Sequence, residues 1–309
     1  MRTIEDYLMK KRIEIIIILI SLVLLSLGII FINNTSFDKL PSTKAIAQKN
    51  ISTPTLFVHG WKAGLHSELP LANLAVKTGV AQRGLIIKVS TSGRIYCHGS
   101  LTGKSAPEIL VKFCNYNAGE FKYARWLHQV MMILKTKYGV THYNAIGHSM
   151  GAYALVAYNE MYGNQANLPI LNKLVLIAGP FDGILNRHRW NQPITGKVAK
   201  LWDDSINQNR LLPNGRPQII HAEYRYLLKR VTNFPNQARV LNIYGNLDNG
   251  SNSDGTVSVT SALSLGYLLK NHVKGYQVMG NYGYTAEHTL LNEINNNVKQ
   301  RILKFIWCS

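Results

Sequence analysis

The stretch THYNAIGHSMGAYALVAY, residues 141–158, contains the pattern G-x-S-x-G with Ser149 at its centre. An apolar, strand-like run precedes this serine, and a helix-like run follows it directly. A strand that passes at once into a helix makes a sharp turn, and Gly147 and Gly151 relieve the crowding there. The pattern predicts a reactive serine at the carboxyl edge of a sheet. The alternative is an ordinary serine in a glycine-rich packing turn.

A reactive serine needs partners later in the chain, because a hydroxyl is a weak nucleophile until a base removes its proton. Asp254 follows the strand-like run VLNIYG, and His288 lies in YTAEHTLL after the next helix and strand. Both are expected at the same sheet edge as Ser149. His272 is a rival base, but it ends a helix before a strand and is expected at the opposite edge.

Two aspartates compete for the role of the acid. Asp248 lies three residues past Gly245, and Asp254 begins the sequence DGTV. We favour Asp254, because Val257 and the apolar helix after it would fix its loop. The sequence DNGSN around Asp248 is typical of a flexible turn.

The early run FVHGW supplies the third requirement, a site for the oxyanion. Its Gly60–Trp61 turn can present the backbone N–H of Trp61, and the N–H of Met150 would be the second donor. Two such donors lower the barrier by several kcal/mol. This chemistry needs no cofactor and no metal. The sequence DNGSNSDG resembles a calcium loop, but Gly250 stands where a ligand should be.

The pattern of the chain after residue 50 predicts an α/β fold. Strand-like and helix-like runs alternate from residue 51 to residue 309, which indicates one doubly wound, mainly parallel sheet. The run LIIKVSTSGRIYCHG is typical of an inserted antiparallel hairpin. Residues 181–238 break the alternation, and we interpret them as a cap over the site. The last twenty residues are expected to form one helix with an apolar stripe.

The N-terminus predicts a membrane anchor. Residues 15–32, IIIILISLVLLSLGIIFI, are apolar and uncharged, and Lys10, Lys11 and Arg12 precede them. A helix of this length just crosses a bilayer core. Residues 1–14 are therefore expected in the cytoplasm, and everything after residue 32 outside the cell. Residues 33–50 are interpreted as a linker. A cleaved signal peptide is less favoured, because the A-x-A at Ala45 lies far beyond the apolar run.

The charge balance suggests partners. The chain has 34 basic and 16 acidic residues, and 30 and 13 of them follow the anchor, an excess of about 17 positive charges. Such a field attracts polyanions, for which anionic wall polymers or lipid head groups are candidates outside a cell. Nucleic acid is not expected, because the sequence has no zinc-finger or RNA-binding motif. A solubilising surface charge is the alternative.

Three cysteines are too few for a disulfide framework. Cys97 and Cys114 lie in strand-like runs joined by a loop, so a single bridge between them is one possibility. Two small buried thiols are the favoured alternative.

The sequence also resembles a known family. Several runs resemble the α/β-hydrolase superfamily and, within it, the membrane-bound cell-surface hydrolases of Gram-positive bacteria, a domain of unknown function. These runs are LFVHGW, AIGHSMGAYALVAY, LVLIAGPFDG, VLNIYGNLDNGSNSDGTVSVTSALSL and EHTLL, within residues 50–309. The resemblance implies Ser149 as nucleophile, Asp254 as acid, His288 as base and the inserted hairpin. It implies no substrate.

These observations predict a membrane-anchored extracellular serine hydrolase that acts on small-molecule or lipid-like carboxylic esters. The alternative, from another class, is a non-catalytic surface module that binds anionic wall polymers or a partner through its basic face.

Overall fold

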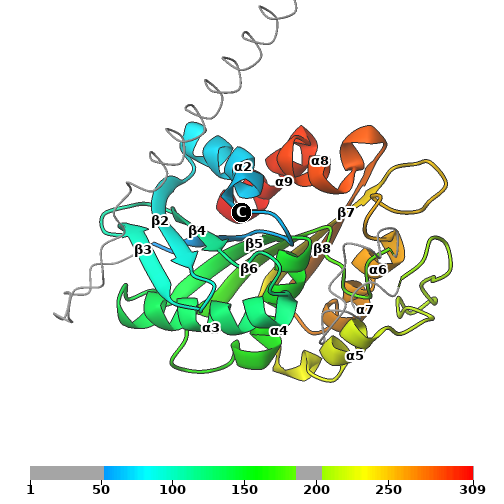
Figure 1. Ribbon diagram of the computed structural model, residues 1–309, viewed down its shortest axis with the longest axis horizontal. Coiled ribbons are helices and arrows are strands. Elements are labelled where there is room, and N and C mark those ends of the chain that lie inside the picture. The colour runs from blue at the N-terminus through cyan, green and yellow to red at the C-terminus, as the bar shows by residue number, and fades with distance from the viewer. Residues whose placement is uncertain (1–51, 186–203, 309) are drawn as a thin grey trace, which may run out of the picture. The chain divides into compact units, whose positions relative to one another are not determined.

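An eight-stranded sheet runs through the chain in the order β3-β2-β4-β1-β5-β6-β7-β8 (Figure 1). The computed structural model describes residues 52–185 and 204–308. β2 and β3 pair antiparallel, and the other neighbours pair parallel, which confirms the predicted sheet and hairpin. The strands are β1 (Thr55–Val58), β2 (Gln82–Val89), β3 (Ile95–Gly99), β4 (Pro107–Phe113), β5 (His142–His148), β6 (Ile170–Ile177), β7 (Arg239–Asn246) and β8 (Gly275–Tyr282).

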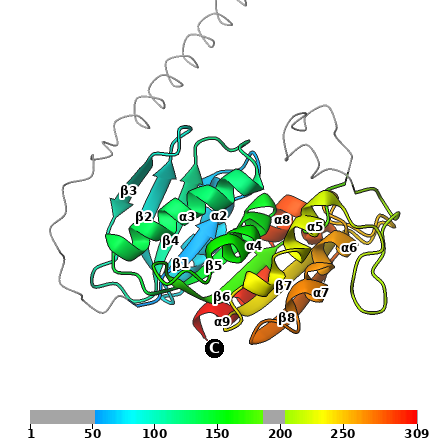
Figure 2. The ribbon, with the colours of Figure 1, turned by 90° about the horizontal axis from the view of Figure 1, so that it is seen from below.

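Helices cover both faces of this sheet (Figures 1 and 2). On one face lie α3 (Glu120–Thr136), α4 (Met150–Tyr162), α5 (Ala222–Leu228), α6 (Val259–Leu263) and α7 (Leu265–Leu269). On the other lie α2 (Leu65–Lys77), α8 (His288–Glu293) and α9 (Asn296–Trp307). The 3-10 helices η3 (Val231–Asn233) and η4 (Tyr284–Ala286) complete the described elements. The arrangement is the doubly wound fold that the alternating pattern predicts.

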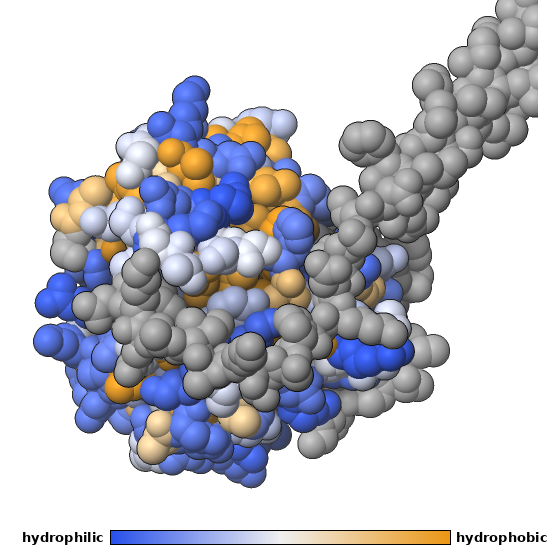
Figure 3. Space-filling model, turned by 90° about the vertical axis from the view of Figure 1, so that its left-hand side faces the viewer, coloured by the Kyte–Doolittle hydropathy of each residue, from blue (hydrophilic) through white to orange (hydrophobic). Residues whose placement is uncertain are grey.

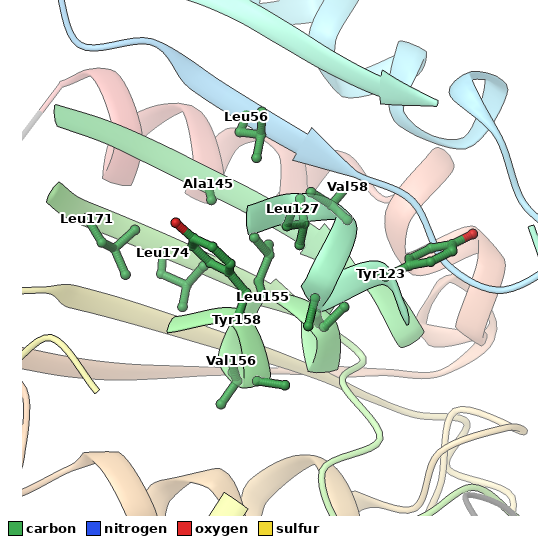
Figure 4. Close-up of a cluster of buried hydrophobic side chains, with 14 of the residues drawn as sticks. Leu56, Val58, Tyr123, Leu127, Ala145, Leu155, Val156, Tyr158, Leu171 and Leu174 are labelled. Carbon is green, nitrogen blue, oxygen red and sulfur yellow. The ribbon is translucent and has the colours of Figure 1, made fainter. Parts of the chain in front are cut away.

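The sheet separates two apolar cores. Between the sheet and α3 and α4, buried side chains such as Leu56, Leu127 and Leu155 pack together (Figure 4). Phe57 and Ile146 face the opposite core, which α2, α8 and α9 close. Because the central strands are buried on both faces, their apolar residues run without alternation.

The helices differ from the sequence analysis in two places. No helix was expected over Leu65–Lys77, where Pro70 interrupts an otherwise acceptable helical sequence. The last twenty residues form two helices rather than one, because the Asn295 side chain accepts a hydrogen bond from the Val298 N–H and begins a new helix. Ile294, which was expected in the apolar stripe, lies at this break and is 47% exposed.

The three cysteines are free thiols. β2 lies between β3, which carries Cys97, and β4, which Cys114 follows. Strands in a sheet are about 4.8 Å apart, so the two cysteines are separated by roughly 10 Å or more. A disulfide needs Cα atoms within about 7 Å. The possible Cys97–Cys114 bridge is therefore wrong, and the two thiols are separate.

Several predicted segments lie outside the described residues. They are the tail at 1–14, the anchor at 15–32, the linker at 33–50 and the part of the cap at 186–203. Among the residues that the structure does describe, no helix has the length and apolar character to cross a membrane. The face in Figure 3 shows hydrophilic residues interspersed with smaller hydrophobic areas.

Candidate active site

Ser149 stands at the sharp turn between β5 and α4. Its backbone has φ 54° and ψ −125°, a left-handed conformation that a non-glycine residue adopts at a cost of about 1–3 kcal/mol. The flanking glycines make the turn possible. A β-carbon on Gly151 would collide with the carbonyl oxygen of Val58, and one on Gly147 would lie 2.9 Å from the Ala152 nitrogen. The serine is thus held where strand and helix pack most closely.

His288 joins the serine to the acid. Its Nε2 lies 2.9 Å from the Ser149 Oγ, and its Nδ1 lies 2.8 Å from the Asp254 Oδ2. His288 is the first residue of α8, which follows β8 and η4. The three side chains come from three segments far apart in sequence, and all three are buried. This is the geometry that a base needs to take a proton from a serine hydroxyl.

The loop after β7 fixes Asp254. Its Oδ1 accepts hydrogen bonds from the N–H groups of Thr256 at 2.9 Å and Val257 at 2.7 Å. Val257 is buried, as the sequence predicted for a residue that holds this loop on the core. One carboxylate oxygen therefore orders the loop, and the other faces His288. Asp248 is exposed, and its own N–H bonds to the Asn246 side chain.

Opposing effects set the proton affinity of His288. Burial lowers its pKa, but the charge of Asp254 and the hydrogen bond that the His288 ring donates to the Asp254 carboxylate together outweigh burial. The pKa of His288 is therefore raised above the ordinary value of 6.5. Asp254 thus favours the protonated form of the His288 ring.

The early His-Gly turn lies against the serine. A β-carbon on Gly60 would lie 3.0 Å from the Ser149 Cβ, so the turn at Gly60 packs directly against Ser149. The His59 ring orders this turn, because its Nδ1 donates to the Gly60 carbonyl at 2.8 Å and its Nε2 accepts from the Phe113 N–H. Met150 begins α4, where the helix dipole favours negative charge.

The chain matches one known protein family over most of its length. Residues 42–309 match the family described as alpha/beta hydrolase of unknown function (DUF915). The chain belongs to this family. The family resemblance predicted from the sequence is confirmed. No curated protein gives a significant match.

Solved structures agree with this α/β-hydrolase assignment at the level of the fold. The lin2722 gene product of Listeria innocua is 24% identical with a TM-score of 0.69, over 82% of this chain and 94% of that one. A protein assigned as a cell surface hydrolase from Lactobacillus plantarum is 21% identical with a TM-score of 0.62, over 84% and 91% of the two chains. At these identities the likeness extends to the fold alone.

The remaining candidate residues lie elsewhere in this α/β-hydrolase. His272 follows α7 and precedes β8, and its Nε2 bonds to the Phe234 carbonyl at 2.6 Å, away from Ser149. Within the described ranges, no group of three or more His, Cys, Asp and Glu side chains is arranged to hold a metal ion. His148 has no catalytic role that the sequence pattern predicts, although it stands directly before Ser149.

Proposed function

We propose that this α/β-hydrolase is a serine hydrolase that cleaves carboxylic esters. One observation carries the proposal, the continuous hydrogen-bonded chain from the Ser149 Oγ through His288 to Asp254. A buried serine, histidine and aspartate aligned in this way support proton transfer away from the hydroxyl. The strained backbone of Ser149 supports the same role, because such strain is kept at functional turns.

In the proposed reaction, Ser149 Oγ attacks the ester carbonyl while His288 Nε2 takes its proton. The N–H groups of Trp61 and Met150 stabilise the negative oxygen of the tetrahedral intermediate. His288 then returns the proton to the leaving alkoxide, and an alcohol departs. Water, deprotonated by His288, attacks the acyl-serine, and His288 returns this proton to the Ser149 Oγ as the carboxylic acid leaves. Asp254 stabilises the imidazolium in both halves of the reaction.

A fluorophosphonate probe tests the proposal, because it reacts only with an activated serine. The wild-type protein is expected to be labelled and to hydrolyse short-chain esters. Ser149→Ala should remove both properties and leave the thermal midpoint nearly unchanged. Ser92→Ala, which removes an exposed hydroxyl in the turn after β2, is the matched control. Failure to label the wild type, or labelling of Ser149→Ala, would exclude Ser149 as the nucleophile.

The same proposal includes location at the outer face of a membrane. It is supported by the uncharged run at residues 15–32 and the basic residues Lys10, Lys11 and Arg12 before it. Protease added to intact cells should then release a soluble domain that begins within residues 33–50. Cleavage only after cell lysis would mean that the topology is reversed.

A second function, electrostatic attachment to anionic polymers, is supported by an asymmetry of burial. No lysine or arginine of the described ranges is buried. The surface charge there is consequently almost entirely positive. Most of the acidic side chains, by contrast, are buried, namely Glu68, Glu108, Glu120, Glu160, Asp182, Asp204, Glu223 and Asp254.

Basic residues also lie on both faces of the sheet, for example Lys122 on α3 and Lys304 on α9. A flexible polymer can contact both faces, whereas a planar surface contacts one. Binding to a polyol-phosphate polymer should therefore weaken steeply as salt rises. Binding of Ser149→Ala should equal that of the wild type. Salt-independent retention would contradict an electrostatic attachment.

A further inference from the structure

His148, the residue before Ser149, makes a side-chain hydrogen bond that has no role in the proposed reaction as described above. The residue is 6% exposed at the end of β5. Its Nε2 lies 3.0 Å from the backbone carbonyl oxygen of His288. Because a carbonyl oxygen only accepts hydrogen bonds, the ring proton lies on Nε2. The other ring nitrogen, Nδ1, is buried without a hydrogen-bond partner in the part of the chain that the structure describes.

This hydrogen bond is one of four that hold His288 in place. The His288 N–H donates to the Asp254 carbonyl at 3.0 Å, while its carbonyl accepts from His148. Its two ring nitrogens bond to Asp254 and Ser149. Both main-chain groups and both ring nitrogens are therefore occupied. The partner of the His288 N–H is Asp254 in the loop after β7, and the partner of the His288 carbonyl is His148, the residue before Ser149.

The His148 side chain links two segments 140 residues apart in the sequence. Together with the hydrogen bond between Ser149 and His288, it joins the start of α8 to the end of β5. An apolar side chain of similar size would fill the same space, but would leave the His288 carbonyl without this donor. A misplacement of about 1 Å at a reacting centre costs on the order of 100-fold in rate.

The charge state of His148 suits this position. Its ring centroid lies 4.8 Å from that of His288. Burial, and to a smaller extent the neighbouring His288, lower the pKa of His148 to about 3. His148 is consequently neutral at neutral pH. A neutral neighbour does not repel the imidazolium that His288 becomes during the proposed reaction.

We infer that His148 is a positioning residue for the proposed hydrolysis. Its Nε2–H holds the main chain of His288 and thereby sets the distance between the Ser149 Oγ and the His288 Nε2. The inference rests on the proposed serine mechanism, and it adds a residue that touches neither the substrate nor the transferred proton.

The test compares two replacements of His148 in the full chain. His148→Gln keeps an N–H donor at a similar reach, whereas His148→Leu keeps the volume and removes the donor. His142→Leu, at the exposed start of the same strand, is the control. His148→Leu should lower kcat and the fluorophosphonate labelling rate by about 10- to 100-fold, with KM nearly unchanged. His148→Gln should stay within about fivefold of the wild type, because it restores the donor.

A purely structural role for His148 predicts another pattern. Both variants would then lose thermal stability, and the labelling rate per folded molecule would not change. Equal labelling of folded His148→Leu and wild type would overturn this inference alone. Equal loss in His148→Gln and His148→Leu would also overturn it, because the donor would then not matter. Absence of labelling in the wild type would instead overturn the proposed function itself.

Discussion

Two aspartate–histidine pairs lie among the residues that the structure describes, and one of these two reaches a serine. In the first, the Asp254 carboxylate lies 2.8 Å from the His288 Nδ1, and the Ser149 hydroxyl lies at the far nitrogen. In the second, the Asp182 carboxylate lies 3.5 Å from the His221 Nδ1. That nitrogen donates instead to the Asp182 backbone carbonyl at 2.8 Å.

The carboxylates also serve different partners. Both oxygens of Asp182 are used within its own segment, one by the His221 N–H and one by the Asn209 side chain. Asp254 uses one oxygen for its loop and keeps the other for His288. The first pair is therefore suited to proton transfer, and the second joins the start of the predicted cap segment to His221 in its later part. An aspartate beside a histidine does not define a site; the group at the other ring nitrogen does.

The largest expected difference between the pairs concerns rate. Asp254→Asn should lower the rate of ester hydrolysis by about 10³- to 10⁴-fold, because the amide misplaces the His288 proton. Asp182→Asn should leave the rate per folded molecule unchanged and lower the thermal midpoint. Fluorophosphonate labelling, normalised to the folded fraction, measures both. Similar rate losses in the two variants would remove the distinction between the pairs.

The sequence predicted the sheet and the positions of Asp254 and His288 at its carboxyl edge. Asp254 and His288 each follow a core strand, and parallel strands bring their carboxyl ends to one edge. The serine pattern then indicated where the two should meet. His221 lies in the irregular segment at 181–238, where no strand order predicts its neighbours.

Contacts between distant segments could not be predicted in the same way. The His148 ring bonds to the His288 carbonyl oxygen, whose position depends on where α8 begins. The Glu287 side chain sets that boundary, because it accepts hydrogen bonds from the Thr289 and Leu290 N–H groups. Burial of Glu68 and Glu120 runs against the usual exposure of carboxylates, so composition alone could not predict it. The sequence separation of Cys97 and Cys114 likewise did not reveal that β2 lies between their strands.

The second largest effect is expected at the turn beside the serine. In Gly60→Ala the new methyl group would lie 3.0 Å from the Ser149 Cβ and 3.3 Å from the His148 carbonyl oxygen. Either the serine or the proposed oxyanion turn must shift, so kcat should fall by about 10- to 100-fold. Gly64→Ala in the same loop meets only the His66 ring at 3.5 Å and serves as the control. Full activity of Gly60→Ala would separate this turn from the reaction.

The two histidines should also differ in their response to pH. His288 accepts a proton only when neutral, and its pKa is raised by Asp254 against burial. The labelling rate should therefore rise with pH through a midpoint above the ordinary 6.5. The control His221→Gln should leave this midpoint unchanged. A midpoint at or below 6.5 in the wild type would contradict the assigned balance of charge and burial.

His221 should instead contribute to stability. Hydrogen bonding to Asp182 raises its pKa to about 9, against the opposing effect of burial. Because this pKa is higher in the folded than in the unfolded chain, the protonated His221 stabilises the folded state fully below pH 6.5. This stabilisation is lost as the pH rises through about 9. The thermal midpoint of the wild type should exceed that of His221→Gln by roughly 2–4 °C at pH 6, and the gap should close by pH 10. A difference in thermal midpoint that stays constant with pH would show that His221 and Asp182 do not form a charged pair.

The smallest effect is expected at Asp248, the other aspartate of the loop after β7. It is exposed, six residues before Asp254, and has a left-handed backbone with φ 57°. Asparagine tolerates this conformation well. Asp248→Asn should consequently change the labelling rate by less than about tenfold, since only one carboxylate can reach the His288 Nδ1 at about 2.6–3.2 Å. A loss as large as that of Asp254→Asn would make Asp248 the acid and leave Asp254, with its bonds to Thr256 and Val257, as a residue that orders the loop.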